Sequence, residues 1–154
     1  MKIAKQFFIA ACVVMLLANC SPNRTMDSPA ELKNFAQRYA DAWCSHDPEK
    51  VAAFYAKGGS ISINGGPATP IADVARGFFL GFPDAGVTFD KLENTPNGAE
   101  FHWTFTGTNT GPNGTGNKVR INGYEVWKID NDGLVAESQG HFDAADYERQ
   151  LKGK

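Results

Sequence analysis

The segment from residue 99 to residue 143 constrains the fold of this chain more than any other part. It reads as three consecutive β-strands, and the first two keep their apolar side chains on one face. Glu125 occupies a position on that apolar face. Because a carboxylate buried among aromatic side chains is costly unless something pairs with it, we expect this face to line a pocket. The apolar series are Phe101, Trp103 and Phe105 in the first strand, and Val119, Ile121, Trp127 and Ile129 in the second.

The first 19 residues are expected to be a signal peptide that does not belong to the fold. Lys2 and Lys5 give a positive start, and residues 7–18 form an uncharged, mostly apolar run that is short for a membrane-spanning helix. The run ends in Leu-Ala-Asn-Cys, which resembles a bacterial lipobox, whose cysteine (here Cys20) is acylated and becomes the mature N-terminus. The alternative is an ordinary secretory signal cut nearby, with Cys20 unmodified.

A lipidated Cys20 predicts where the protein resides. Acyl chains would hold it to a membrane surface without a spanning helix. The polar residues 20–28 would then form the lipidated tether. Ser21 follows the cysteine and gives no aspartate retention signal. We therefore expect a cell-envelope protein, lipid-anchored in the outer membrane and facing the periplasm.

The remainder of the chain suits one domain that does not bind nucleic acid. It has 135 residues from Cys20 onward, and we expect the folded domain over residues 29–152. The signal removes two of the 15 basic residues and none of the 17 acidic ones, which leaves a net charge of −4. Nucleic-acid binding needs a concentrated basic surface, which this charge balance does not support.

The cysteines and histidines show no metal-binding spacing. There are three of each, with no His-x-x-x-His and no Cys-x-x-Cys pair, so we expect no metal and no cofactor. Cys44 is expected to be a small buried hydrophobe in a helix. If Cys20 is not acylated, a Cys20–Cys44 disulfide can form in an oxidising compartment. His102 has the opposite parity to its neighbours and should lie on the outer sheet face, in a surface or interface role.

Helical signals precede the strands. Ser28, Pro29 and Glu31 form a capping box that opens a first helix with one apolar stripe. Asp47 and the following proline open a second, shorter helix, which we expect to end at the glycine pair 58–59. The inner face of this second helix is expected to carry Val51, Phe54 and Tyr55.

The rest of the pattern completes an α+β domain. We expect a short strand at residues 60–63, a third helix around residues 71–79, and a strand over residues 87–94. One or two helical turns are expected at residues 144–151. Helices followed by hairpin-linked strands predict helices packed on one face of a curved antiparallel sheet.

Several stretches resemble a known superfamily. FAQRYADAWCSHDPEKVAAFYA resembles the opening helices of the nuclear-transport-factor-2-like superfamily, NTF2-like for short. GFPDAGVTFD, HWTFTGTNTG and VRINGYEVWKIDNDGLVAE resemble its SnoaL-like polyketide cyclase branch in order and spacing. The likeness covers about residues 30–151. It implies a cone-shaped α+β barrel of the cystatin-like kind, often a homodimer through the outer sheet surface, with an apolar pocket inside the cone.

The resemblance also implies polar pocket residues for acid–base work. Glu125 matches the family's acidic position, and an apolar pocket would raise its pKa. The alternative is a structural carboxylate bonded to a tyrosine or a backbone amide. The family's last strand often reads Glu-His-Trp-Asp, but here the His and Asp positions are Ser138 and Gly140. His141 and Asp143 could substitute as an oriented pair if they face the cavity, or they form a solvated strand end.

Only one parity of the last strand can face the cavity. One set contains Glu137, Gln139, His141 and Asp143, and the other contains Ser138, Gly140 and Phe142. The catalytic candidates are Glu125, His141 and Asp143. The pocket-lining candidates are Tyr39, Trp43, Tyr55, Phe79, Trp103 and Ser138.

Three functions fit this sequence. The favoured one is an envelope lipoprotein whose SnoaL-like domain binds a small apolar or amphipathic molecule. The second is an isomerase, cyclase or hydratase that uses Glu125 as its acid–base residue. The third is a non-catalytic module that dimerises or docks a partner through the outer sheet face.

A cavity in which Glu125 lies beside a second titratable group would favour the enzyme, and a cavity without such groups would favour binding alone. Glu125 paired to backbone amides without a cavity would favour the interaction module.

Overall fold

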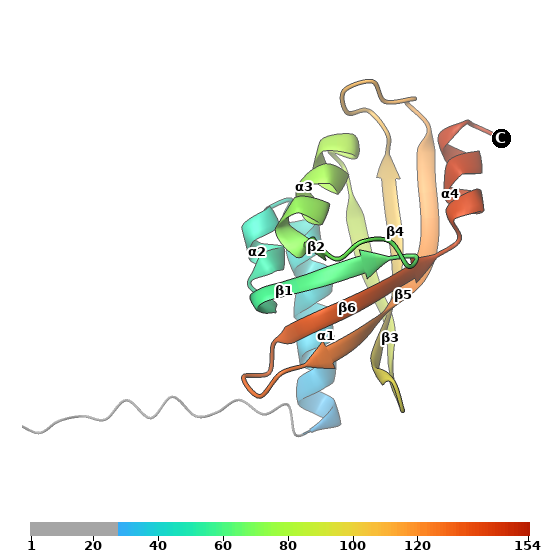
Figure 1. Cartoon of the computed structure of the whole chain (residues 1–154). Coiled ribbons are helices and arrows are strands. Elements are labelled where there is room, and N and C mark those ends of the chain that lie inside the picture. Colours follow the sequence, from blue (N-terminus) through green and yellow to red (C-terminus); the bar gives the residue numbers. More distant parts are fainter. Residues whose placement is uncertain (1–27) are drawn as a thin grey trace, which may run out of the picture.

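A curved six-stranded sheet in the order β2-β1-β6-β5-β4-β3 forms the frame of the protein (Figure 1). The computed structural model describes residues 28–154, so the expected signal peptide and Cys20 lie outside the described residues. The strands are β1 (Tyr55–Ile63), β2 (Thr69–Pro70), β3 (Gly86–Thr95), β4 (Gly98–Thr108), β5 (Lys118–Ile129) and β6 (Val135–Phe142). The helices are α1 (Pro29–Cys44), α2 (Pro48–Ala52), α3 (Ile71–Gly81) and α4 (Ala144–Leu151).

The first two helices begin where their capping residues predict. The Glu31 amide donates to Ser28 Oγ at 3.1 Å, and Ser28 Oγ donates to Glu31 Oε2 at 3.0 Å, which completes the capping box of α1. Asp47 caps α2 in a similar way, through the Glu49 amide. In the described part of the chain, no helix has both the length and the apolar character needed to cross a membrane.

The inner face of the sheet carries the residues that alternation predicts. Phe101 of β4 stacks on Trp127 of β5 with ring centroids 4.8 Å apart, and Tyr39 of α1 packs edge-on against both rings. These rings belong to the main core cluster, which joins α1 to the sheet. The register places Glu125 opposite Phe101, so this carboxyl lies inside the same core. The α+β fold with a curved sheet and packed helices is therefore confirmed.

The sheet is mixed rather than wholly antiparallel, because β1 runs parallel to β6. Strand order along the chain cannot reveal this pairing, since five elements, β2, α3, β3, β4 and β5, separate β1 from β6 in the sequence. The interpretation of the second helix was also wrong at its end. Tyr55 begins β1 instead of lying on α2, and Gly58 and Gly59 lie inside that strand. An irregularity between Tyr55 and Ser60 accommodates the two glycines, and Gly58 has a φ of +81°.

A bulge in β3 changes which side chains face outward. Phe89 pairs with Trp103, but Lys91 pairs with His102, so Asp90 is an extra residue in this strand. Before the bulge, the odd-numbered Phe89 faces the core, where it stacks on Phe101. Beyond the bulge the odd-numbered Lys91 and its neighbour at position 93 face outward.

Candidate functional site

A small internal cavity lies between the helices and the concave face of the sheet. Its volume is about 50 Å³, which is room for a few water molecules. Among the described residues that line it, Glu125 has the only ionisable side chain. The other lining residues are Trp43, Ile61, Ile63, Val74, Phe78, Val87, Phe101, Trp103, Phe105, Ile121, Gly140 and Phe142.

Four side chains donate hydrogen bonds to the Glu125 carboxyl, which is only 5% exposed. Trp127 Nε1 and Ser138 Oγ each donate to Oε2 at 2.8 Å. Tyr55 donates to the same oxygen at 3.3 Å, and Tyr39 lies 3.4 Å from both oxygens. The two tyrosine hydroxyls are also 3.4 Å apart. The tyrosine contacts are long for O–H···O bonds, so Trp127 and Ser138 make the strong contacts.

Burial sets the protonation behaviour of this cluster. Removal from water raises the pKa of the Glu125 carboxyl above 4.5, although the hydrogen bonds from Trp127, Ser138 and the tyrosines act in the opposite direction. Burial also raises the pKa of Tyr39 and Tyr55 well above 10, and the nearby Glu125 charge adds to the rise. Both phenols therefore stay protonated donors near neutral pH.

The two oxygens of Glu125 have different surroundings. Oε2 accepts from Trp127, Ser138 and the tyrosines, whereas Oε1 accepts only the 3.4 Å contact from Tyr39 among the described residues. Oε1 is therefore the oxygen with spare capacity to take a proton or to bond a group in the cavity. The cluster holds one titratable carboxyl in a fixed orientation, with phenolic donors beside it.

Two glycines shape the space around the carboxyl. A Cβ on Gly123 would lie 2.7 Å from Cζ2 of Trp103, so the missing side chain lets this indole lie across β5. Gly140 pairs with Glu125 across β5 and β6 and lines the cavity. A Cβ there would meet Ile61 Cδ1 at 3.4 Å and Glu125 Cγ at 3.9 Å, so an alanine would fill cavity space without striking backbone.

The structure brings most of the expected pocket residues together. Trp43 and Trp103 line the cavity, and Tyr39, Tyr55 and Ser138 contact the Glu125 carboxyl directly. Phe79 is the exception, because its ring packs against Trp43 and His46 instead. Its neighbour Phe78 takes the wall position on α3.

His141 and Asp143, expected as further acid–base candidates, do not reach the cavity. Gly140 and Phe142 face inward from β6, so His141 faces outward and stacks on Tyr124 with ring centroids 4.9 Å apart. Asp143 accepts from the Asp146 amide at 2.9 Å and caps α4. The interpretation of these two residues as a solvated strand end fits their positions, and the paired-base alternative does not.

Sequence reasoning treated Trp127 as plain core and missed its bond to Glu125. The two residues are two positions apart on β5, so their side chains share a face, and an indole N–H needs a partner when buried. A buried carboxylate and a tryptophan at this spacing are therefore a signal for such a pair.

Comparisons with known proteins identify the family of this fold. The model of the SnoaL-like domain matches residues 36–138, which is more than half of the chain and includes Glu125. The chain belongs to the SnoaL-like domain family. No protein with curated function matches the sequence.

Solved structures show the same fold at low sequence identity. A hypothetical protein with a ketosteroid isomerase-like fold from Catenulispora acidiphila, in complex with trimethylamine, is 12% identical and has a TM-score of 0.65, covering 77% of this chain and 92% of its own. TsrD from Streptomyces laurentii is 18% identical with a TM-score of 0.69, covering 82% and 98%. An NTF2-like protein of unknown function from an Exiguobacterium species is 17% identical with a TM-score of 0.58, covering 71% and 98%. These likenesses establish the fold alone.

Proposed function

We propose that this SnoaL-like protein binds a small, mostly apolar or amphipathic molecule in the cavity inside the cone, with the polar end of the molecule at Glu125. The observation that carries the proposal is a single buried carboxyl in an otherwise apolar, largely aromatic wall. Its four donors offset the cost of burial, but they leave Oε1 with spare hydrogen-bonding capacity. A ligand with one polar group would use the spare capacity of Oε1.

The size of the cavity limits the ligand. Pockets for drug-sized molecules span roughly 300–1,000 Å³, whereas this cavity is about 50 Å³. The occupant is therefore either a molecule of a few heavy atoms or a larger one that displaces wall side chains. Val74 and Phe78 of α3 form part of the wall, and their helix is the element whose shift would enlarge the cavity.

A small amine is a suitable first probe. The Catenulispora protein of the same fold was found with trimethylamine. In this chain the aromatic wall and the Glu125 carboxylate would both attract an ammonium group, the rings through their faces and the carboxylate through its charge. A bound ammonium would also stabilise the ionised form of Glu125.

The test combines native mass spectrometry with one substitution in the wall. Protein purified from its own cells under mild conditions should carry a small molecule, and trimethylamine added to the emptied protein should shift the NMR signals of cavity residues. Gly140→Ala should weaken both, whereas Gly77→Ala on the exposed side of α3, where a new methyl meets nothing within 4 Å, should leave both unchanged. Absence of any bound molecule and of any shift would reject the binding function.

Proton transfer is the second candidate function. Glu125 lies beside two further titratable groups, Tyr39 and Tyr55, which is the arrangement expected of an isomerase, cyclase or hydratase. Glu125 would move the proton, and the phenols, which are not among the residues that line the cavity, would hold its carboxyl in place through their hydrogen bonds. Glu125→Gln should then abolish exchange of acidic C–H protons of carbonyl compounds into deuterated water. Retained exchange would exclude Glu125 as the base.

We further propose that Cys20 carries the lipid that places the protein in the cell envelope. The sequence at residues 17–20 supports this anchor, and the acidic domain from residue 29 onward then faces the aqueous side. Cys20→Ser should move the protein from the membrane fraction to the soluble fraction of its own cells. An unchanged membrane fraction would refute lipid anchoring at this cysteine.

A further inference from the structure

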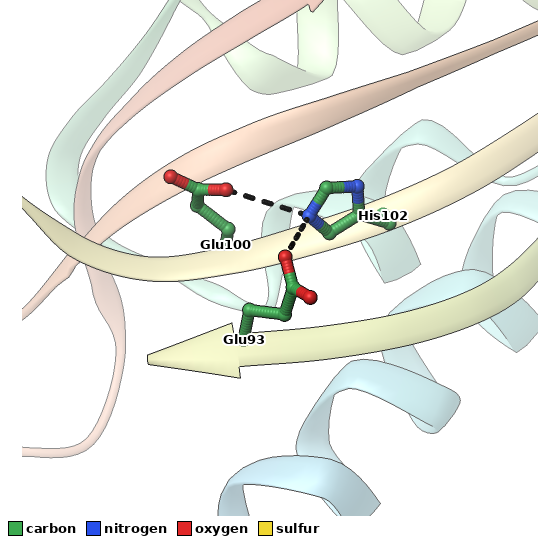
Figure 2. A group of neighbouring side chains, drawn as sticks. All are labelled: Glu93, Glu100 and His102. Atoms are coloured by element: carbon green, nitrogen blue, oxygen red, sulfur yellow. Dashed lines mark ion pairs between the residues drawn. The ribbon is translucent and has the colours of Figure 1, made fainter. Parts of the chain in front are cut away.

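We propose that Glu93, Glu100 and His102 form a binding site for a divalent transition-metal ion of the Zn²⁺ type on the outer face of the sheet. One atom from each side chain lies within 4.8 Å of the other two (Figure 2). The cluster lies on the opposite face of the sheet from Glu125, so it neither depends on the cavity nor shares a residue with it.

The strand register assembles this cluster. Glu93 of β3 is paired directly with Glu100 of β4, and His102 lies two residues further along β4 on the same face. The bulge at Asp90 is necessary for this arrangement, because without it the odd-numbered residue 93 would share the inner face with Phe89. Spacing along the chain therefore could not reveal the site, since its ligands come from two strands with a shifted parity.

The distances match those between ligand atoms that share one metal ion. His102 Nε2 lies 3.2 Å from Glu93 Oε2 and 3.4 Å from Glu100 Oε2. Two ligand atoms that share one Zn²⁺ at about 2.0–2.1 Å in tetrahedral geometry are about 3.3–3.4 Å apart. His102 Nε2 is buried and makes no aligned hydrogen bond to a described residue, although it lies within ion-pair distance of both carboxylates.

The charges at the cluster also lack compensation. Two carboxylates directly opposite each other on neighbouring strands repel. Lys91 Nζ pairs with Glu93 at 2.8 Å, but through Oε1, so Glu93 Oε2 is left facing His102 and Glu100. A divalent cation between the three atoms would neutralise the remaining charge.

The ligand set selects the class of metal. An imidazole nitrogen with two carboxylate oxygens suits first-row ions such as Zn²⁺, whereas sites for Mg²⁺ and Ca²⁺ use oxygen ligands. Three protein ligands leave at least one coordination position for water or another molecule. Such an ion would also join β3 to β4 near the turn of their hairpin.

The test uses the full chain, first treated with a chelator and then titrated with Zn²⁺ by calorimetry. One strong site per chain is expected. Glu100→Gln and His102→Gln should each weaken it by at least about tenfold, since changes outside the ligand shell already cost that much. The matched control is His141→Gln, another outer-face histidine, which should bind Zn²⁺ like the unchanged chain.

The imidazole NMR signals give a second readout that does not depend on variants. The chain has three histidines, and only the ring nitrogens of His102 should shift when one equivalent of Zn²⁺ is added. Three outcomes would overturn the proposal: no stoichiometric binding, equal loss of binding in His141→Gln, or unchanged His102 signals. In those cases the His102 side chain contacts the two carboxylates without a metal ion.

Discussion

Substitution of Ser138 by alanine tests whether the hydrogen bonds to the Glu125 carboxyl stabilise its ionised form. Ser138 is 2% exposed, and its hydroxyl donates to Glu125 Oε2 at 2.8 Å. A hydrogen bond to a charged group contributes about 1.5–3 kcal/mol to stability. We therefore expect Ser138→Ala to lower the free energy of unfolding by about 2 kcal/mol at neutral pH. For a domain of this size, that is a fall in Tm of about 6–8 °C.

The stability that Ser138→Ala loses should be smaller in acid than at neutral pH. Burial raises the folded pKa of Glu125 above 4.5, so the folded protein holds this proton more tightly than the unfolded chain does. Its contribution to stability is therefore complete below about pH 4.5 and is lost as the pH rises through the folded pKa. Ser138→Ala removes a bond that favours the ionised form, so its cost should be small in acid and larger at neutral pH.

Urea denaturation followed by tryptophan fluorescence measures this difference. Ser62→Ala is the matched control, because Ser62 lies on the outer side of β1 and has no side-chain hydrogen bond to another described residue; it should change stability by less than about 0.5 kcal/mol. In a Glu125→Gln background, Ser138→Ala should cost about half as much, since bonds between neutral groups are about half as strong. A cost that is equal at all pH values, or equal in both backgrounds, would refute the reasoning.

Three further predictions concern stability and turn geometry. Glu125→Gln should flatten the fall in stability between acid and neutral pH, and an unchanged urea–pH profile would show that another group causes it. Gly98→Ala should destabilise the β3–β4 hairpin by about 1–3 kcal/mol, because Gly98 has a φ of +136° and a Cβ would strike the Trp127 carbonyl; a thermal scan that shows no loss would contradict this. Gly77→Ala should raise stability by up to about 1 kcal/mol, since it removes a glycine from an exposed helix interior, and a lower Tm would count against it.

The inner face of the sheet could be predicted from the sequence because alternation there has no interruption. Phe101, Trp103 and Phe105 keep one parity along β4, and Glu125 shares the parity of the apolar residues of β5. The sequence therefore predicted a carboxyl on the inner face of the sheet. The aromatic stripe of α1 likewise predicted that Tyr39 and Trp43 lie in the core.

The features that could not be predicted depend on pairings between distant strands. Tyr55 follows Val51 at helical spacing, yet pairing of β1 with β6 places it in a strand. The bulge at Asp90 reverses the parity of Glu93. Alternation along the sequence therefore could not predict that Glu93 lies beside His102. The inward parity of β6 was undecided in the sequence, because both alternatives carried polar residues, and only the register of Gly140 against Glu125 settles it.

The central claim is that Glu125 is a buried, titratable carboxyl in the wall of an internal cavity. The most direct measurement is a pH titration of the carboxyl carbon of Glu125 by ¹³C NMR, with the signal assigned by its absence from Glu125→Gln. The account predicts a midpoint clearly above 4.5, with a signal that moves when a small molecule enters the cavity. A midpoint at or below 4.5 would mean that solvation or the four donors outweigh the effect of burial, and a signal that no small molecule moves would contradict the binding function.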